Sequence, residues 1–308
     1  MTTELVDRMA SVRAYLEAAN SGNTRRAYAA DWAAFSTWCK TQGVDALPAP
    51  PAEVARYLAQ LADGGLKPST IRRRAAAISA AHKAAGYEPP TNLEGVKATL
   101  RGIRRTLGAR KRKVKPATVQ LLATALGNLP DSLRGKRDRA LLAVGFAAAR
   151  RRSELVAFTV EDIERRPRGI MLHLRRSKTD QEGKGAQIPI PNGRAIRPVE
   201  ALDAWLTASG IVSGPIFREV TRHGTIGKSA LSDRAVARIV KQVVGAAGLQ
   251  ASDFSGHSLR AGFITDALDR KVDYFTIMKQ SGHAKVDTLK EYDRRENDFD
   301  DHAGDDFL

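Results

Sequence analysis

The chain has 308 residues, a size typical of one large domain or two ordinary ones. A hydrophobic content of 43% supports real cores, and a formal net charge of +16 predicts a polyanionic partner, most simply nucleic acid. No apolar run approaches the length of a membrane span, and the single cysteine, Cys39, excludes an internal disulfide and a zinc finger.

The N-terminus lacks the basic start and apolar run of a secretory signal, so we expect a cytoplasmic protein with no membrane partner.

The first 108 residues are expected to be all-helical. Apolar residues then recur at helical spacing in several segments, and Ser69 or Thr70 can cap the fourth of them. The expected helices are 1–20, 24–43, 50–65, 67–86 and 91–108. We therefore predict a helical domain over 1–108.

Two of these helices carry basic runs. Either run alone could be a solvated face, but residues 1–114 hold 19 Lys and Arg against 9 Asp and Glu. Beside the first run the surface is rich in alanine, which lets a helix approach a groove closely. These charges favour contact with DNA phosphates. The predicted DNA-binding residues here are Arg72, Arg73, Arg74, Arg101, Arg104 and Arg105.

A basic linker is expected over 109–115. Its like charges repel one another and favour an extended chain. Such a segment can follow a phosphate backbone, or it can serve as a hinge without DNA contact. We predict contact through Arg110, Lys111, Arg112 and Lys113.

The second domain is expected over 116–294, and it mixes two periodicities. Helical patterns occupy 118–126 and 132–150, and Ser153 is expected to cap another helix. Alternating apolar residues around 170–174 and 188–190 then predict two strands joined by a polar loop. Helical patterns return over 192–210 and 231–248. The predicted fold class is mainly α with a small β-sheet (α+β).

The stretch 254–294 gathers residue types that suit phosphoryl transfer. His257 and Arg260 lie three residues apart, on one face if a helix starts near Ser258. Gly282 and His283 are expected to open a further helix with Thr288 and Tyr292 on one face. An arginine binds phosphate oxygens, a histidine moves protons and a phenol can be a nucleophile.

The motifs HSLR and SGHAKVDTLKEY in this stretch resemble those of the tyrosine recombinases, or phage integrase family. The resemblance implies an upstream arginine in R-x-S-E-L and a lysine in a β-hairpin. Arg151 in ARRRSELVAF and Lys178 in LRRSKTDQEG fit these places. The chain has the six family positions in the family order: Arg151, Lys178, His257, Arg260, His283 and Tyr292.

The resemblance implies a role for each position. Tyr292 would attack a phosphodiester, hold the 3′ side as a phosphotyrosine and release a 5′-hydroxyl. Arg151 and Arg260 would bind the non-bridging oxygens and stabilise charge in the transition state. Glu154 either orients an active-site group or forms an ordinary helix ion pair.

Proton transfer is assigned by the same resemblance. Lys178 would protonate the leaving 5′-hydroxyl, although Lys184, Arg175 and Arg176 lie close by in sequence. His257 would accept or donate a proton near the nucleophile.

The remaining site residues leave alternatives open. His283 would donate a hydrogen bond to the phosphate, in a place where some relatives have tryptophan, or it caps a helix. Arg151 is preferred over Arg150 and Arg152 by spacing alone, and Arg152 stands where the family often has an apolar residue. The histidines outside any motif are interpreted as structural: His82, His173, His223 and His302.

The resemblance implies a site-specific DNA recombinase that needs no metal, ATP or other cofactor. Its expected partner is a double-stranded recombination site with inverted repeats. It would be a monomer or weak oligomer when free and a homotetramer on DNA, exchanging strands through a Holliday junction. The alternatives are a type IB topoisomerase-like relaxing enzyme and a non-catalytic DNA-binding protein.

The C-terminal tail over 295–308 differs from the rest of the chain. Residues 291–308 hold 2 basic and 8 acidic side chains. The tail is expected either to dock on a basic surface of a neighbouring subunit or to be a solvating tail.

Overall fold

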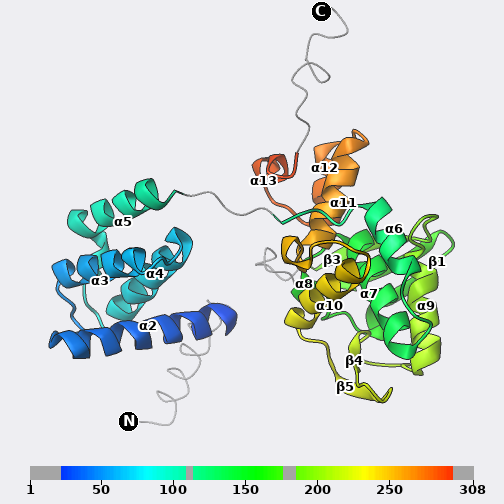
Figure 1. Ribbon diagram of the computed structural model, residues 1–308, viewed down its shortest axis with the longest axis horizontal. Coiled ribbons are helices and arrows are strands. Elements are labelled where there is room, and N and C mark those ends of the chain that lie inside the picture. Colours follow the sequence, from blue (N-terminus) through cyan, green and yellow to red (C-terminus); the bar gives the residue numbers. More distant parts are fainter. Residues whose placement is uncertain (1–21, 109–113, 176–184, 294–308) are drawn as a thin grey trace, which may run out of the picture. The chain divides into compact units, whose positions relative to one another are not determined.

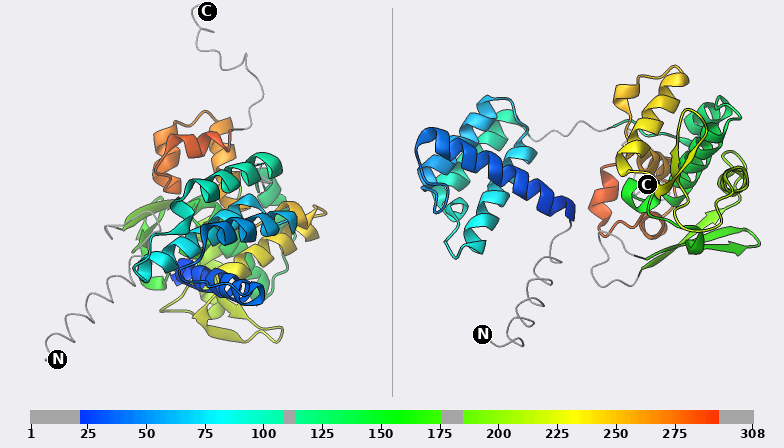
Figure 2. Two further views of the ribbon diagram at one scale, coloured as in Figure 1. Left: turned by 90° about the vertical axis from the view of Figure 1, so that its left-hand side faces the viewer. Right: turned by 90° about the horizontal axis from the view of Figure 1, so that it is seen from below.

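A computed structural model describes residues 22–108, 114–175 and 185–293. The chain divides into two compact units, Met1–Arg112 and Lys113–Leu308. The predicted linker, 109–115, spans this division. The two units are drawn in Figure 1 and from two further directions in Figure 2.

Within 22–108 the first unit is all-helical, as predicted. Its core is formed by buried residues such as Phe35, Leu58 and Ile71. Helix α2 packs against α4, and α3 packs against α5. The helices are α2 (Gly22–Gln42), α3 (Pro51–Asp63), α4 (Pro68–Ala84) and α5 (Glu94–Leu107), with the 3-10 turn η1 (Pro90–Asn92) before α5.

The start of α4 corrects one prediction. The helix begins at Pro68 with Lys67 in the N-cap position, so Ser69 and Thr70 lie inside its first turn and do not cap it. Proline suits this place because its fixed φ is already helical and its missing N–H would have no partner there.

His82 is structural, in agreement with the sequence interpretation. It is fully buried, and its Nε2 accepts a hydrogen bond from the amide of Ala49 at 2.9 Å. Its Nδ1 lies 2.8 Å from the carbonyl oxygen of Ile78. Because an amide only donates and a carbonyl only accepts, Nδ1 carries the proton.

The second unit has the predicted mixture of helices and short strands. Its helices are α6 (Val119–Gly127), α7 (Leu133–Ala148), α8 (Arg152–Leu155), α9 (Pro198–Ser209), α10 (Asp233–Ala246), α11 (Ser258–Asp269), α12 (Tyr274–Ser281) and α13 (Val286–Lys290). Two 3-10 turns are η2 (Val160–Asp162) and η3 (Ala251–Asp253). The strands are β1 (Ile163–Arg166), β2 (Gly169–Leu174), β3 (Ala186–Pro191), β4 (Arg218–Val220) and β5 (Ile226–Ala230). The α+β fold class is confirmed.

The strands form two antiparallel sheets, one in the order β1-β2-β3 and one pairing β4 with β5. In the first, Ile170 pairs with Ile190 and Leu172 with Ile188, and all four side chains are buried as the alternation predicted. Strands β1, β4 and β5 were not predicted. They are short, and of their residues only Val220 is buried, so no apolar alternation marks them.

The core of the second unit is arranged around α7, which packs on α9, α11 and β3. Eleven of the sixteen residues of α7 are buried, because it has neighbours on most sides. Trp205 of α9 is fully buried and donates its indole N–H to the carbonyl oxygen of Ile216 at 2.8 Å. This rigid centre carries the C-terminal end of α7, from which the candidate site begins.

A backbone strap joins the start of the second unit to α11. Lys115 donates its amide to the carbonyl oxygen of Asp253, and Ala117 donates its amide to that of Ser258, both at 2.9 Å. The amide of Val119 is capped by the Asp266 carboxylate at 2.6 Å. Lys115, which was predicted as linker, is therefore bonded to the second unit.

Candidate active site

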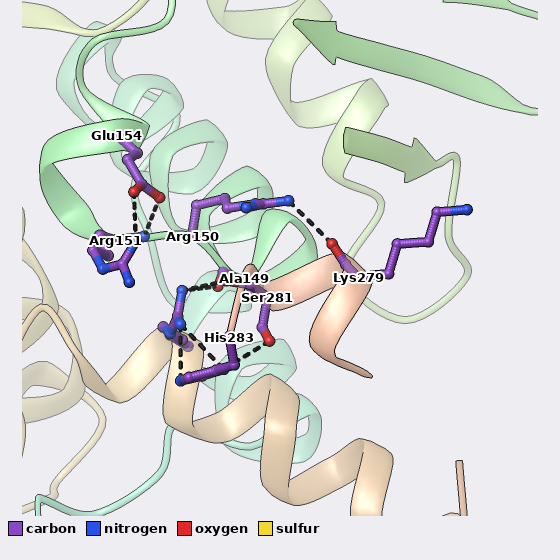
Figure 3. A network of polar contacts seen from close by, with 8 residues as sticks. Ala149, Arg150, Arg151, Glu154, Lys279, Ser281 and His283 are labelled. Atoms are coloured by element: carbon purple, nitrogen blue, oxygen red, sulfur yellow. Dashed lines mark hydrogen bonds and ion pairs between the residues drawn. The ribbon is translucent and has the colours of Figure 1, made fainter. Parts of the chain in front are cut away.

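The turn after α7 directs three consecutive arginines to three different partners. Ala149 ends the helix in the left-handed region, with φ of 51°. Arg150 then points its guanidinium to the carbonyl oxygen of Lys279, and Arg151 points to Glu154 (Figure 3). Arg152 instead forms an ion pair with Asp233, with 3.1 Å between Nε and Oδ2.

Arg151 is held by Glu154 on both its side chain and its backbone. Its Nη1 donates to Oε1 at 2.8 Å, and its amide donates to Oε2 at 3.1 Å. Glu154 is 5% exposed, so this is not an exposed ion pair of the weak surface kind. Arg151 is the N-cap of α8, and Ser153, predicted as the cap, lies inside that helix. The cap prediction was wrong because the carboxylate of Glu154, and not the hydroxyl of Ser153, accepts a hydrogen bond from the backbone amide of Arg151 at the start of the helix.

Arg150 is a buried arginine that the sequence analysis did not select. It is 7% exposed, and Nη2 donates to the carbonyl oxygen of Lys279 at 3.2 Å. Burial lowers the pKa of this guanidinium, and the carboxylate of Glu154 opposes that effect. A buried guanidinium is costly to desolvate, so a buried arginine at this position indicates a role in the site.

Arg260 projects from the first turn of α11 into the centre of the site. The helix begins at Ser258, with His257 in the N-cap position, as the motif spacing predicted. Arg260 is 2% exposed, and its Nη1 donates to the carbonyl oxygens of Ala149 and Ser281. Its Nη2 lies 2.8 Å from Nε2 and 3.1 Å from Nδ1 of His283. One guanidinium thus joins the ends of α7 and α12.

His283 follows the left-handed turn at Gly282 that ends α12. Its Nδ1 lies 2.8 Å from Oγ of Ser281, and that Oγ lies 2.7 Å from the carbonyl oxygen of Ile277 (Figure 3 shows the Ser281 contact). The ring of Tyr292 lies 5.8 Å away, centroid to centroid.

Tyr292 reaches the site from beyond the end of α13, not from within a helix. The predicted helix is present and carries Thr288, but its extension to Tyr292 was wrong, because α13 ends at Lys290 and the amide of Tyr292 donates to the carbonyl oxygen of Leu289. The phenol oxygen lies 2.5 Å from Nε2 of His257. The phenol and imidazole are therefore in direct hydrogen-bond contact.

Burial and positive charge shift the ionisation of this cluster. Desolvation and the charge of Arg260 lower the pKa of His283 to about 3. The same two causes lower the pKa of His257. Desolvation, followed by the charge of Arg151, lowers the pKa of Arg260 to about 10. Both imidazoles are thus neutral near pH 7, and His257 can accept a proton.

The pKa of Tyr292 is raised by desolvation, which exceeds the opposing attraction of Arg260. The phenol therefore keeps its proton near neutral pH. A proton acceptor is needed before the phenol can act as a nucleophile, and His257 Nε2 occupies that place.

The structure brings together six of the predicted site residues: Arg151, Glu154, His257, Arg260, His283 and Tyr292. The seventh, Lys178, lies outside the described residues, as do Arg110, Lys111, Arg112 and Lys113. Within the described ranges no cluster of three or more His, Cys, Asp or Glu side chains could hold a metal ion. No helix in that part of the chain is long and apolar enough to cross a membrane.

Comparison with known proteins identifies the family. Residues 114–298 match the model of the phage integrase family, and residues 12–88 match that of the phage integrase N-terminal SAM-like domain. An integrase/recombinase xerD homolog of Selenomonas ruminantium is 42% identical over 94% of this chain and 86% of its own length. The chain belongs to the phage integrase family. It is a tyrosine recombinase, an enzyme of site-specific DNA cleavage and rejoining.

Other relatives of this recombinase extend the comparison. Recombinase cre of Escherichia phage P1 is 27% identical over 85% of this chain and 80% of its own length. The fold is similar to that of a lambda integrase (75-356) dimer bound to a COC' core site, with a TM-score of 0.61, 19% identity and 96% of each chain covered.

The predicted DNA-binding residues of the first unit differ in their surroundings. Arg73 forms an ion pair with the buried carboxylate of Asp31 at 2.8 Å, and Arg74 donates to the Tyr57 hydroxyl at 2.7 Å. These two therefore help to hold α2 and α3 to α4. Arg73 is nevertheless exposed, as are the other four: Arg72, Arg101 (paired with Glu94), Arg104 and Arg105.

A basic face on α10 was missed by the sequence analysis. Arg234, Arg238 and Lys241 are exposed at spacings of four and three, and none forms an ion pair with another residue of the described ranges. Helix α10 adjoins the site, because Gly256, next to His257, packs against Ala237. The basic i, i+4, i+7 pattern could have been recognised in the sequence.

Proposed function

We propose that this recombinase cleaves DNA by attack of the Tyr292 phenol oxygen on the scissile phosphorus. The new bond is a phosphotyrosine ester on the 3′ side, and the bond that breaks joins phosphorus to the 5′ oxygen. The contact of 2.5 Å between Tyr292 and His257 Nε2 carries the proposal, because it pairs the nucleophile with a neutral base. The phenol proton passes to that nitrogen.

Arg260 and Arg151 are proposed to bind the non-bridging oxygens. Both positive charges act on the phenol, and they lower the pKa of Tyr292 against the effect of burial. Planar guanidiniums suit a phosphate, and they stabilise charge that develops in the transition state. Glu154 positions Arg151 through its two hydrogen bonds. His283 donates to the phosphate when the DNA is in place.

Lys178 is proposed as the general acid that protonates the leaving 5′ oxygen. The proposal is supported by the family motif in LRRSKTDQEG, since this residue is outside the described part of the chain. The ester keeps the energy of the broken bond, so a second 5′-hydroxyl can reverse the step without ATP. These steps need no metal ion.

The DNA partner is proposed to be a duplex recombination site with inverted repeats. Exposed arginines of the first unit, the basic segment 110–113 and the basic face of α10 would bind phosphates. The protein would be a monomer or weak oligomer when free, in the cytoplasm, and a homotetramer on DNA that works through a Holliday junction. A solved relative is a lambda integrase tetramer bound to a Holliday junction, with a TM-score of 0.61, 20% identity and coverage of 96% of this chain and 78% of that one.

The acidic tail, 295–308, is proposed to pass to a neighbouring subunit. A cavity of about 910 Å³ on the second unit is lined by apolar residues such as Phe263 and Val272, with Arg168, Arg194 and Lys279 among its basic members. The tail contains Phe299 and Phe307, eight residues apart, and many carboxylates. The phenylalanines match the apolar lining of the cavity, and the carboxylates match its basic residues.

Covalent trapping tests the proposed function. Wild type and Tyr292→Phe are incubated with nicked duplexes of random core sequence and denatured in SDS, and the protein-linked DNA is sequenced. A wild-type adduct at Tyr292, enriched for one inverted repeat, is expected. Adducts without sequence enrichment would favour topoisomerase-like relaxation. If the protein binds a duplex that carries its preferred binding site but forms no adduct with it, catalysis would be contradicted.

A further inference from the structure

Ser281 sits between two groups that compete for its single hydroxyl proton. It is the last residue of α12 and is fully buried. Its Oγ lies 2.7 Å from the carbonyl oxygen of Ile277 and 2.8 Å from Nδ1 of His283. A hydroxyl has one proton to donate and two lone pairs that accept.

The donors and acceptors around this hydroxyl are satisfied by one arrangement. A carbonyl oxygen only accepts, so Ser281 donates to Ile277, the usual bond of a helical serine to the carbonyl four residues before it. Nδ1 of His283 must then carry a proton and donate to Ser281. Its Nε2 is left with a lone pair, and the donor-only Nη2 of Arg260 lies 2.8 Å from Nε2 and 3.1 Å from Nδ1.

The opposite tautomer of His283 is unfavourable because of Ser281. With the proton on Nε2, the Ser281 proton would have to leave Ile277 for Nδ1. The serine oxygen and the carbonyl oxygen of Ile277, two acceptors 2.7 Å apart, would then be desolvated without a bond in return.

We propose that Ser281 is a positioning residue that holds His283 in the Nδ1–H tautomer, with an unprotonated Nε2 beside the guanidinium of Arg260. The inference rests on the proposed role of His283 at the phosphate. It adds a residue that acts through His283 and does not itself touch the DNA.

This arrangement has a consequence for the arrival of the phosphate. A phosphate oxygen draws the Nη2 group of Arg260 away from His283 Nε2, and an acceptor lone pair would then face an anion. His283 can donate there only after Nε2 takes up a proton, while Nδ1–H stays bonded to Ser281. Binding of the scissile phosphate is therefore coupled to proton uptake at His283.

The charges around His283 agree with this coupling. In the free protein, burial and neighbouring positive charge hold its pKa at about 3, and an incoming anion offsets those charges and raises the pKa. The titratable or charged groups that face the ring are Arg260 and His257 at the start of α11, Arg150 and Arg151 after α7, and Tyr292 after α13.

The Ser281 hydroxyl can be removed without removing the hydrogen bond between Arg260 and residue 281. Arg260 bonds to the backbone carbonyl of Ser281, which Ser281→Ala keeps. Thr265 offers a matched control in α11. Its buried hydroxyl has no hydrogen-bond partner among the described residues, so Thr265→Val removes a hydroxyl that fixes nothing.

The test is the protonation pattern of the His283 ring in the full-length protein without DNA. Two-bond ¹H–¹⁵N correlation spectra of ¹⁵N-histidine protein distinguish a protonated from an unprotonated ring nitrogen, and His283→Asn assigns the signals. Wild type and Thr265→Val are expected to show Nδ1 protonated and Nε2 unprotonated near neutral pH. Ser281→Ala is expected to show a mixture of tautomers. Protonated Nε2 in wild type, or an unchanged pattern in Ser281→Ala, overturns the proposal.

Cleavage adds a second readout that separates this proposal from the proposed function. Ser281→Ala should slow covalent cleavage about 10-fold at saturating DNA, as is typical when the partner that orients an active-site histidine is lost. Duplex affinity and folding should stay at the wild-type level, and Ser281→Thr, which keeps a hydroxyl, should recover part of the rate. Absence of cleavage by wild type would contradict the proposed function, whereas the tautomer is measured without it.

Discussion

The guanidinium of Arg150 lies in the space that a side chain at Gly282 would occupy. A Cβ built on Gly282 would lie 2.2 Å from Nη1 of Arg150. Gly282 also has φ of 70°, which favours glycine. The turn that leads into His283 can therefore follow its path only because residue 282 is a glycine, which leaves room for the guanidinium of Arg150.

Gly282→Ala is expected to displace either Arg150 or the turn, and so to move His283. We expect covalent cleavage to fall at least 10-fold, since small displacements of positioned groups are costly. Gly210→Ala is the matched control, because Gly210 has φ of 64° with no atom within 4 Å of a built Cβ. The control bears the same backbone strain of about 1 kcal/mol without the clash. Equal cleavage by the two variants would show that the Arg150 contact does not position the turn.

The basic face of α10 is expected to bind DNA phosphates. Arg238→Ala should weaken duplex binding similarly for all sequences and reduce the slope of log affinity against log salt by about 1. Arg238→Lys keeps a phosphate-binding charge and serves as the control. Fluorescence anisotropy over a salt series measures both quantities. An unchanged slope in Arg238→Ala would place α10 away from the DNA.

Removal of residues 297–308 is expected to weaken assembly on DNA while single-site binding stays unchanged. The physical reason is the loss of apolar side chains and carboxylates that match the cavity bordered by Arg168 and Arg194. Gel-shift titration separates the two kinds of complex. The double variant Arg168→Glu with Arg194→Glu should repeat the assembly defect in the full chain. Normal assembly by the truncated protein would mean that the tail only solvates the protein.

Gly262→Ala should destabilise the second unit by more than about 2 kcal/mol, the usual cost of overpacking a buried site. A Cβ there would lie 1.9 Å from the carbonyl oxygen of Ala117, which is backbone and cannot move aside without breaking the strap on α11. Gly245→Ala in α10 is the control, with ordinary contact at 3.7 Å. That variant should be neutral or gain up to about 1 kcal/mol from helix propensity. Urea unfolding measures both, and similar values for the two would contradict the close approach.

Stability should fall in mild acid because of His283. Its folded pKa is about 3, whereas an unfolded histidine titrates near about 6.5. The stabilising effect is present above the unfolded pKa. It is lost as pH falls from about 6.5 towards 3, since the unfolded chain then binds the extra proton. His283→Phe should lose less stability than wild type between about pH 7 and pH 5. Parallel losses in denaturant midpoints would show that His283 is not desolvated.

The sequence by itself determined the fold class and predicted the candidate site residues. Apolar periodicity marked the long helices and the buried faces of β2 and β3, because burial on one side imposes that spacing. The motifs around Arg151, His257 and Tyr292 named the chemistry, and each is short enough to be read locally. Short strands such as β5, none of whose residues is buried, left no periodic pattern and were missed.

Only the tertiary structure decided how those residues meet. Spacing could not separate Arg150, Arg151 and Arg152, because the left-handed turn at Ala149 and the partners around it set where each guanidinium points. Nor could spacing assign Ser281, whose neighbours come from its own helix turn and from a ring held by Arg260. Directions of side chains depend on packing between segments that are distant in sequence, and that packing exists only in the folded chain.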